Sequence, residues 1–142
     1  MGIAIGELSR RTGVKVPTIR YYEQIGLMPA PPRSAGSQRR YGEGDVGRLN
    51  FIRHSRELGF EVDAIRELLT MNAHPDRSCA DVDLIARRHL SEVDRRIERL
   101  MALRGELDRM ISECGQGRVG ECRVIETLSD HSLCTHEYHP KL

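Results

Sequence analysis

The stretch IGELSRRTGVKVPTIRYYEQIG, residues 5–26, decides the fold. Its first half carries Ile5 and Leu8 at helical spacing and meets a helix-stop signal at Gly13. Its second half has Pro17 in the first turn of a second helix, which runs to Gly26. Two short helices joined at a glycine are typical of a helix-turn-helix, whose second helix lies in the major groove of DNA.

The next segment predicts a small β wing. Residues 27–32 are rich in proline and are not expected to be helical, and residues 33–41 place three arginines and a tyrosine around a Gly/Ser turn. Such a segment suits two short strands whose side chains grip backbone phosphate. The alternative is a solvated loop with incidental charge.

Three further helices are predicted after the wing. Residues 45–58 and 61–71 are amphipathic, with a tight corner at 57–60 between them. Residues 79–113 contain no proline and one glycine, which indicates a single long helix. Along it runs a heptad pattern that we call the seam: Ala86, Leu90, Val93, Ile97, Leu100, Arg104, Leu107 and Ile111. A lone helix cannot cover such a seam, so we expect pairing, and the periodicity leaves its direction open.

Composition fits a DNA-binding protein of one domain or of a small domain with an appendage. The 142 residues carry a net charge of +1, but residues 1–60 carry +5 and residues 61–142 carry −4. A basic head on an acidic body indicates a nucleic-acid partner for the head. No leader pattern and no apolar run of roughly 18 residues is present, so we expect a cytoplasmic protein that does not enter a membrane.

Four cysteines, Cys79, Cys114, Cys122 and Cys134, lie in the second half of the chain. In a reducing cytosol they are better read as metal ligands or redox groups than as disulfides. Cys79 and Cys114 flank the long helix and lie about 50 Å apart at 1.5 Å per residue. They cannot share an ion within one straight subunit, but they could share one across an antiparallel dimer.

The region after the long helix is rich in thiol and imidazole groups. Cys114 and Cys122 bound a nine-residue loop with three glycines, which suits a soft or borderline metal ion, although two ordinary thiols beside a turn would look similar. The tail adds four groups, His131, Cys134, His136 and His139. They could supply a fourth ligand, a second ion or a weak scavenging site, or belong to a disordered tail with adventitious affinity.

Several motifs together resemble the mercury-resistance-regulator (MerR) family from about residue 3 to residue 129. They are Ile5 to Leu8, Thr18 to Glu23, Gly26-Leu27, Arg33 to Tyr41 and Phe51 to Arg53. The resemblance implies a mainly α fold: a winged helix-turn-helix head, a long antiparallel coiled-coil dimerisation helix and a C-terminal metal-binding loop. It implies DNA contacts by Thr18, Arg20, Tyr21, Arg33, Arg39 and Tyr41.

The same resemblance divides the chain and selects a class of ion. The expected parts are a DNA-binding domain at 1–75 with linking helices from about 43, a dimerisation helix at 76–113, a metal loop with a short helix at 114–130 and a tail at 131–142. In the family, the loop bounded by two cysteines senses metal. The residue that opens the dimerisation helix is typically serine in sensors of monovalent copper, silver or gold, and cysteine in sensors of divalent ions. Cys79 therefore favours zinc, cadmium or lead, with Cys79 of the partner subunit completing the site of Cys114 and Cys122.

We therefore expect a homodimeric regulator that binds an inverted-repeat promoter, works with RNA polymerase and activates a metal-resistance or efflux promoter by distorting its DNA. The main alternative is a copper(I) sensor of the same family, since thiol number biases metal choice without fixing it. A redox or iron-sulfur sensor is a further alternative, but the closely spaced cysteines of such relatives are missing. A zinc hydrolase lacks its expected His-Glu motif, so we expect no enzyme.

Overall fold

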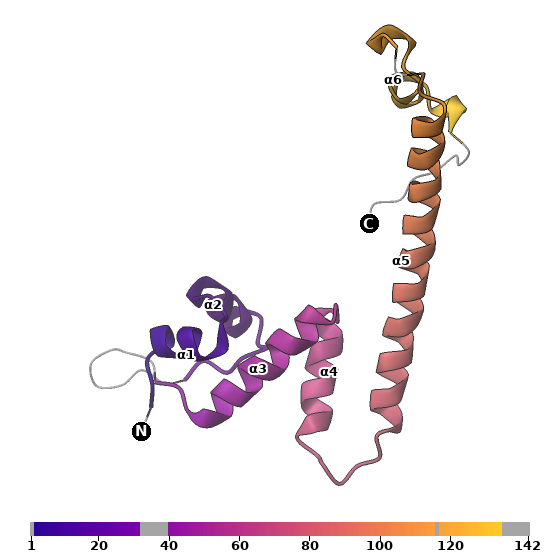
Figure 1. Cartoon of the computed structure of the whole chain (residues 1–142). Helices are drawn as coiled ribbons and strands as arrows, with labels where there is room; N and C mark the ends of the chain where they lie inside the picture. Colours follow the sequence, from indigo (N-terminus) through magenta and orange to yellow (C-terminus); the bar gives the residue numbers. More distant parts are fainter. Residues whose placement is uncertain (1, 32–39, 116, 135–142) are drawn as a thin grey trace. The chain divides into compact units, whose positions relative to one another are not determined.

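The computed structural model describes residues 2–31, 40–115 and 117–134, and these are almost entirely helical (Figure 1). The α-helices are α1 (Ile5–Thr12), α2 (Val16–Gln24), α3 (Glu43–Glu57), α4 (Val62–Asn72), α5 (Ala80–Ser112) and α6 (Arg123–Ser129), with short 3-10 turns η1 (Val119–Glu121) and η2 (His131–Leu133). The predicted helices are confirmed, including the uninterrupted 33-residue α5. No helix in this part of the chain is long and apolar enough to cross a lipid bilayer.

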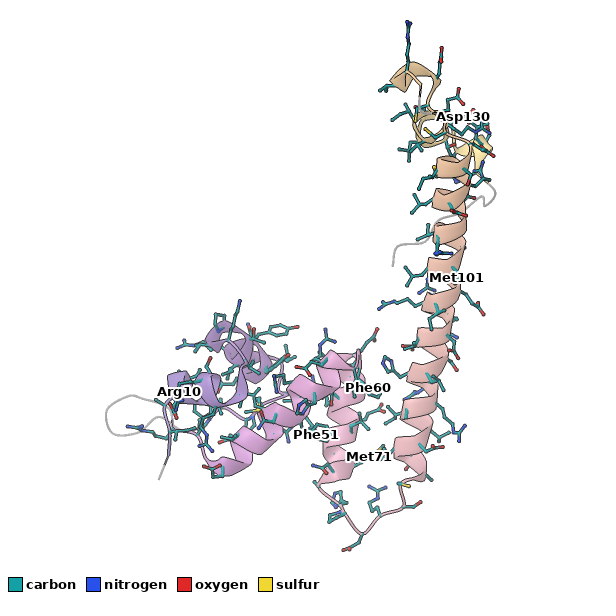
Figure 2. The ribbon with its side chains drawn as sticks, in the orientation of Figure 1. Arg10, Phe51, Phe60, Met71, Met101 and Asp130 are labelled. Atoms are coloured by element: carbon teal, nitrogen blue, oxygen red, sulfur yellow. The ribbon has the colours of Figure 1, made fainter. Side chains whose placement is uncertain are left out.

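The chain divides into two compact units, Met1–Ile85 and Ala86–Leu142. In the first unit α1 packs on α2 and α3, and α3 packs on α4. The core between these helices is apolar; its fully buried side chains include Leu8, Ile19, Leu27, Met28, Tyr41, Leu49, Ile52 and Ile65. Phe60 lies at the corner between α3 and α4, where Gly59 adopts a φ of 87° (Figure 2). A left-handed residue of this kind favours glycine and allows the predicted tight corner.

The turn between α1 and α2 is fixed by hydrogen bonds within the opening stretch. Thr12 is buried, and its hydroxyl donates to the Leu8 carbonyl at 2.8 Å while it accepts from the Val14 amide at 3.3 Å. Gly13 ends α1 with a φ of 74° and donates its N–H to the Ser9 carbonyl. This conformation is strained for other residues, so the glycine that marks the turn in the sequence also makes it possible.

Arginines on α3 and α4 hold the chain where it leaves α2. Arg48 of α3 donates to the Leu27 carbonyl at 2.8 Å, and Arg66 of α4 donates to the Ile25 carbonyl at 3.0 Å. These carbonyls follow the last turn of α2, where intrahelical partners run out. The two bonds therefore set the position of α2 against the rest of the first unit.

The predicted two-stranded wing is not confirmed. Most of it, residues 33–39, lies outside the described residues. Within the described ranges the only β feature is an isolated antiparallel bridge, in which Ile3 and Tyr41 exchange two backbone hydrogen bonds of 2.9 Å. This bridge attaches the end of the arginine-rich segment to Ile3, two residues before α1.

Candidate DNA-binding helix and thiol site

The second helix of the helix-turn-helix has one buried and one accessible face. Ile19 and Tyr22 enter the core, whereas Arg20 and Tyr21 are exposed and Thr18 is half-buried. Guanidinium, phenol and hydroxyl groups on one short helix can bond phosphates and base edges. The structure thus brings together three of the predicted DNA-binding residues.

The other predicted DNA-binding residues have a different setting. Arg33 and Arg39 lie outside the described residues. Tyr41 is 1% exposed, and its hydroxyl donates to the Glu23 carboxylate at 2.9 Å. The structure therefore places Tyr41 in the core, where it ties the end of the arginine-rich segment to α2. Neither periodicity nor composition signals this burial.

The thiols of Cys114 and Cys122 lie next to each other at the end of α5. The two sulfur atoms are 3.7 Å apart, and both side chains are half-buried. The chain returns through η1 to bring Cys122 directly before α6. Two thiolates this close together can both bind one soft or borderline ion.

The start of α6 favours the ionised form of Cys122. The backbone amides of Ile125 and Val124 lower the pKa of Cys122, and the Cys114 side chain adds to this effect. Partial burial and the carboxylate of Glu126 oppose it. Since thiolates rather than thiols bind metals, this environment lowers the proton competition that an incoming ion meets.

Cys79 occupies the other end of α5 and is exposed. It precedes the first helical residue, and its carbonyl accepts the Asp83 amide at 2.9 Å, so its backbone is already part of the helix start. Its side chain lines a pocket of about 250 Å³ that also includes Phe51 and Met71. A thiol in this position is accessible to a second chain.

The beginning of the tail packs against the end of α5. The Leu133 carbonyl accepts a hydrogen bond of 2.8 Å from Arg109. His131 is exposed and Cys134 is half-buried, while His136 and His139 lie outside the described residues. Within the described ranges of a single chain, no three His, Cys, Asp or Glu side chains gather as a metal-binding group.

A helix-turn-helix head with an accessible second helix, followed by a long helix and a thiol pair, defines a DNA-binding regulator. The family model "MerR HTH family regulatory protein" matches residues 3–72, and the model "MerR, DNA binding" matches residues 46–110. The chain belongs to the MerR family. It is accordingly a transcription regulator and not an enzyme.

Relatives match nearly the whole chain. The regulator HmrR of Rhizobium leguminosarum bv. viciae is 43% identical over 89% of this chain and 97% of its own length. The regulator ZntR of Escherichia coli K12 is 40% identical over 87% of this chain and 90% of its own. The structure of PbrR691 from Ralstonia metallidurans CH34 in complex with lead(II) is similar with a TM-score of 0.77, 35% identity and coverage of 89% and 98%.

Proposed function

We propose that this chain is a metal-responsive regulator that binds a divalent soft or borderline ion, zinc, cadmium or lead, and activates a metal-resistance promoter by distorting its DNA. The observation that carries the proposal is the 3.7 Å separation of the Cys114 and Cys122 sulfur atoms on a glycine-rich loop. The lead(II) complex of a relative with 35% identity supports it. When bound, the ion would add a positive charge that draws thiolates together.

The functional unit that we propose is an antiparallel homodimer paired through α5. All eight seam residues are exposed in the single chain, among them Leu90 at 59%, Ile97 at 52% and Ile111 at 66%. Apolar side chains repeated along 33 helical residues need a partner surface, because a single helix leaves them in water. A second copy of the same helix offers a matching apolar surface.

The register of the seam supports an intersubunit metal site. We align two antiparallel copies of α5 by the seam. Every seam residue then faces another seam residue: Ala86 the partner's Ile111, Leu90 the partner's Leu107, Val93 the partner's Arg104, and Ile97 the partner's Leu100. In this alignment Cys79 of the partner subunit lies beyond Ser112, the last residue of α5, on the side where loop 114–122 begins. The alignment that covers the apolar side chains therefore also brings a third thiol to the helix end that carries Cys114 and Cys122.

Ligand number favours a divalent ion over copper(I) in this arrangement. Three thiolates carry three negative charges, and a +2 ion neutralises more of that charge than a +1 ion. The remaining groups, Cys134, His131, His136 and His139, are proposed accessory ligands for a fourth position or a second ion.

On the DNA side, we propose that Thr18, Arg20 and Tyr21 contact the major groove and that Arg33 and Arg39 contact phosphates. Tyr41 would act through packing, because its hydroxyl already donates to Glu23. Two heads in a symmetric dimer would bind an inverted repeat at a promoter used by RNA polymerase in the cytoplasm. An ion that joins residues of both subunits can shift the relative position of the heads only if it binds one arrangement better.

The variant Cys79→Ser tests the proposal. Losing a group that merely supports a ligand costs about 10- to 100-fold in metal affinity, so losing a ligand should cost at least as much. We expect weaker binding of zinc, cadmium and lead in competition with a chelator, loss of promoter activation by these ions and unchanged DNA affinity of the metal-free protein. Unchanged activation of the Cys79→Ser variant by all three ions would overturn the divalent assignment. If the unaltered protein binds copper(I) more tightly than zinc, cadmium and lead, the monovalent alternative is favoured.

A further inference from the structure

An ion-pair network lies directly outside the two thiols. Arg123 donates to Glu113 with a Nε to Oε2 distance of 2.7 Å. Glu113 immediately precedes Cys114, and Arg123 immediately follows Cys122. The pair thus joins the two ends of the thiol loop by a contact that does not involve sulfur.

Both members of this pair are held by further partners. The Glu113 carboxylate also accepts from Arg109 of α5 at 3.3 Å, and Arg123 also donates to Glu126 at 3.2 Å. Arg109 in turn donates to Glu106, a carboxylate only 3% exposed, at 2.8 Å. An isolated surface ion pair contributes little to stability, but a network with a buried member fixes the geometry of its side chains far better.

The loop between these residues needs such a restraint. It contains three glycines, and glycine loses more backbone freedom on ordering than any other residue. Without a contact across its ends, the entropic cost of ordering the loop would reduce the free energy of metal binding. If the ends of the loop are already joined in the metal-free protein, part of this entropy is lost before binding. The affinity of the thiol site for a metal ion is then higher.

We propose that Glu113 and Arg123 are positioning residues of the metal site, which close the loop before an ion arrives and so hold Cys114 and Cys122 at the separation that the ion requires. This inference rests on the proposed function, because it assumes that the two thiols bind metal. Metal affinity then depends on two side chains that do not bind the ion themselves.

The test compares Glu113→Gln, Arg123→Gln and the double variant. Each removes charge, and Glu113→Gln also keeps the side-chain length. Glu121→Gln and Arg118→Gln are matched controls, because they remove the same charges from within the loop, where both side chains are exposed. Zinc, cadmium and lead affinities are measured by chelator competition. Amide hydrogen exchange of residues 114–122 is measured in the metal-free protein, and circular dichroism verifies folding.

We call the Glu113–Arg123 pair the clamp. We expect each single clamp variant to lose about tenfold or more in metal affinity, in line with the loss of other supporting groups around metals. The double variant should lose little more than one single variant, because both remove the same contact. Loop amides should exchange faster in the metal-free clamp variants, and the controls should match the unaltered protein in both measurements.

Three outcomes would overturn the inference. In the first, the clamp variants keep the affinity and the exchange rates of the unaltered protein. In the second, the controls lose as much as the clamp variants, which would make the effect one of general charge. In the third, the unaltered protein binds none of zinc, cadmium and lead; this result alone also removes the proposed function, and so the two failures are distinguishable.

Discussion

At the residue scale, one sulfur atom differs from an ordinary thiol because of the helix that follows it. Cys122 precedes α6, and the amides of Ile125 and Val124 face its sulfur more effectively than Glu126 opposes them, so its pKa is lowered. A lowered pKa moves the change from thiol to thiolate to lower pH. At a given pH the loop therefore holds a larger fraction of thiolate at Cys122 than a free cysteine does.

We predict that Cys122 alkylates with a pH midpoint below that of free cysteine, whose pKa is about 8.5. Iodoacetamide labelling of the metal-free protein, followed by peptide mass spectrometry at a series of pH values, measures this midpoint. The variant Cys114→Ser should keep most of the shift, since the backbone amides are its larger cause. A midpoint equal to that of a cysteine in an unstructured peptide would show that the amides do not stabilise the thiolate.

Individual residues also show where sequence reasoning reaches its limit. The place of Cys114 and Cys122 at the ends of a glycine-rich loop marked them as candidate ligands, and the structure places their sulfur atoms 3.7 Å apart; metal binding by them stays a prediction. The burial of Tyr41 was not predictable, because an aromatic residue among arginines looks the same whether it packs inward or faces DNA. The Glu113–Arg123 pair was missed for a similar reason: it forms only after the loop has turned back, and no helical spacing relates the two residues.

At the scale of elements, helices were predictable because their signals are local. Gly13, Pro17 and Gly26 mark the ends of α1 and α2, and the four-three repeat marks α5. Their bounds agree with the structure to within a few residues, as expected for helix ends that fray. The repeat does not predict which residues of α5 pack within a single chain. Glu106 and Met110, near the end of the helix, are two such buried residues.

The seam of α5 carries a prediction about assembly. Ile97 is 52% exposed in the single chain and, in the proposed dimer, faces the partner's Leu100. In the variant Ile97→Glu an unpaired carboxylate would be buried at this contact, which costs several kcal/mol. The dissociation constant of the dimer should therefore rise by more than about 100-fold. Sedimentation equilibrium over a range of protein concentrations measures it.

The matched control for this experiment is Ser91→Glu. Ser91 lies on the same helix and is exposed, but it is not a seam residue. Adding the same carboxylate there should leave the dimer intact. Equal weakening by both substitutions would mean that α5 does not pair through the seam.

At the scale of the whole molecule, the proposed site exists only in the assembly. In the proposed dimer one chain would contribute the loop thiols and the other Cys79, so each dimer would contain two composite sites. Neither site can be complete in a monomer if α5 stays one uninterrupted helix of about 50 Å. Metal binding and dimerisation are then linked, and each should strengthen the other.

Mixed dimers test this composite arrangement directly. One chain carries Cys79→Ser, and the other carries Cys114→Ser with Cys122→Ser; differential tags isolate the heterodimer. We expect one ion per heterodimer with unaltered affinity, because one site keeps all three thiols and the other loses all three. Each variant alone should bind no ion at that affinity. A heterodimer without a tight site would show that the three thiols do not combine across the subunits.

The single charged member of the seam has a consequence for the direction in which two helices associate. In a parallel pair each residue meets its own copy, so the guanidinium groups of two Arg104 side chains would face each other in the contact. In the antiparallel register each Arg104 meets the partner's Val93, along which its aliphatic stem can lie while its charged end reaches water. The residue that breaks the apolar repeat thus opposes a parallel pair, in which every Cys79 would lie a full helix length from the thiol loop that it completes in the proposed site.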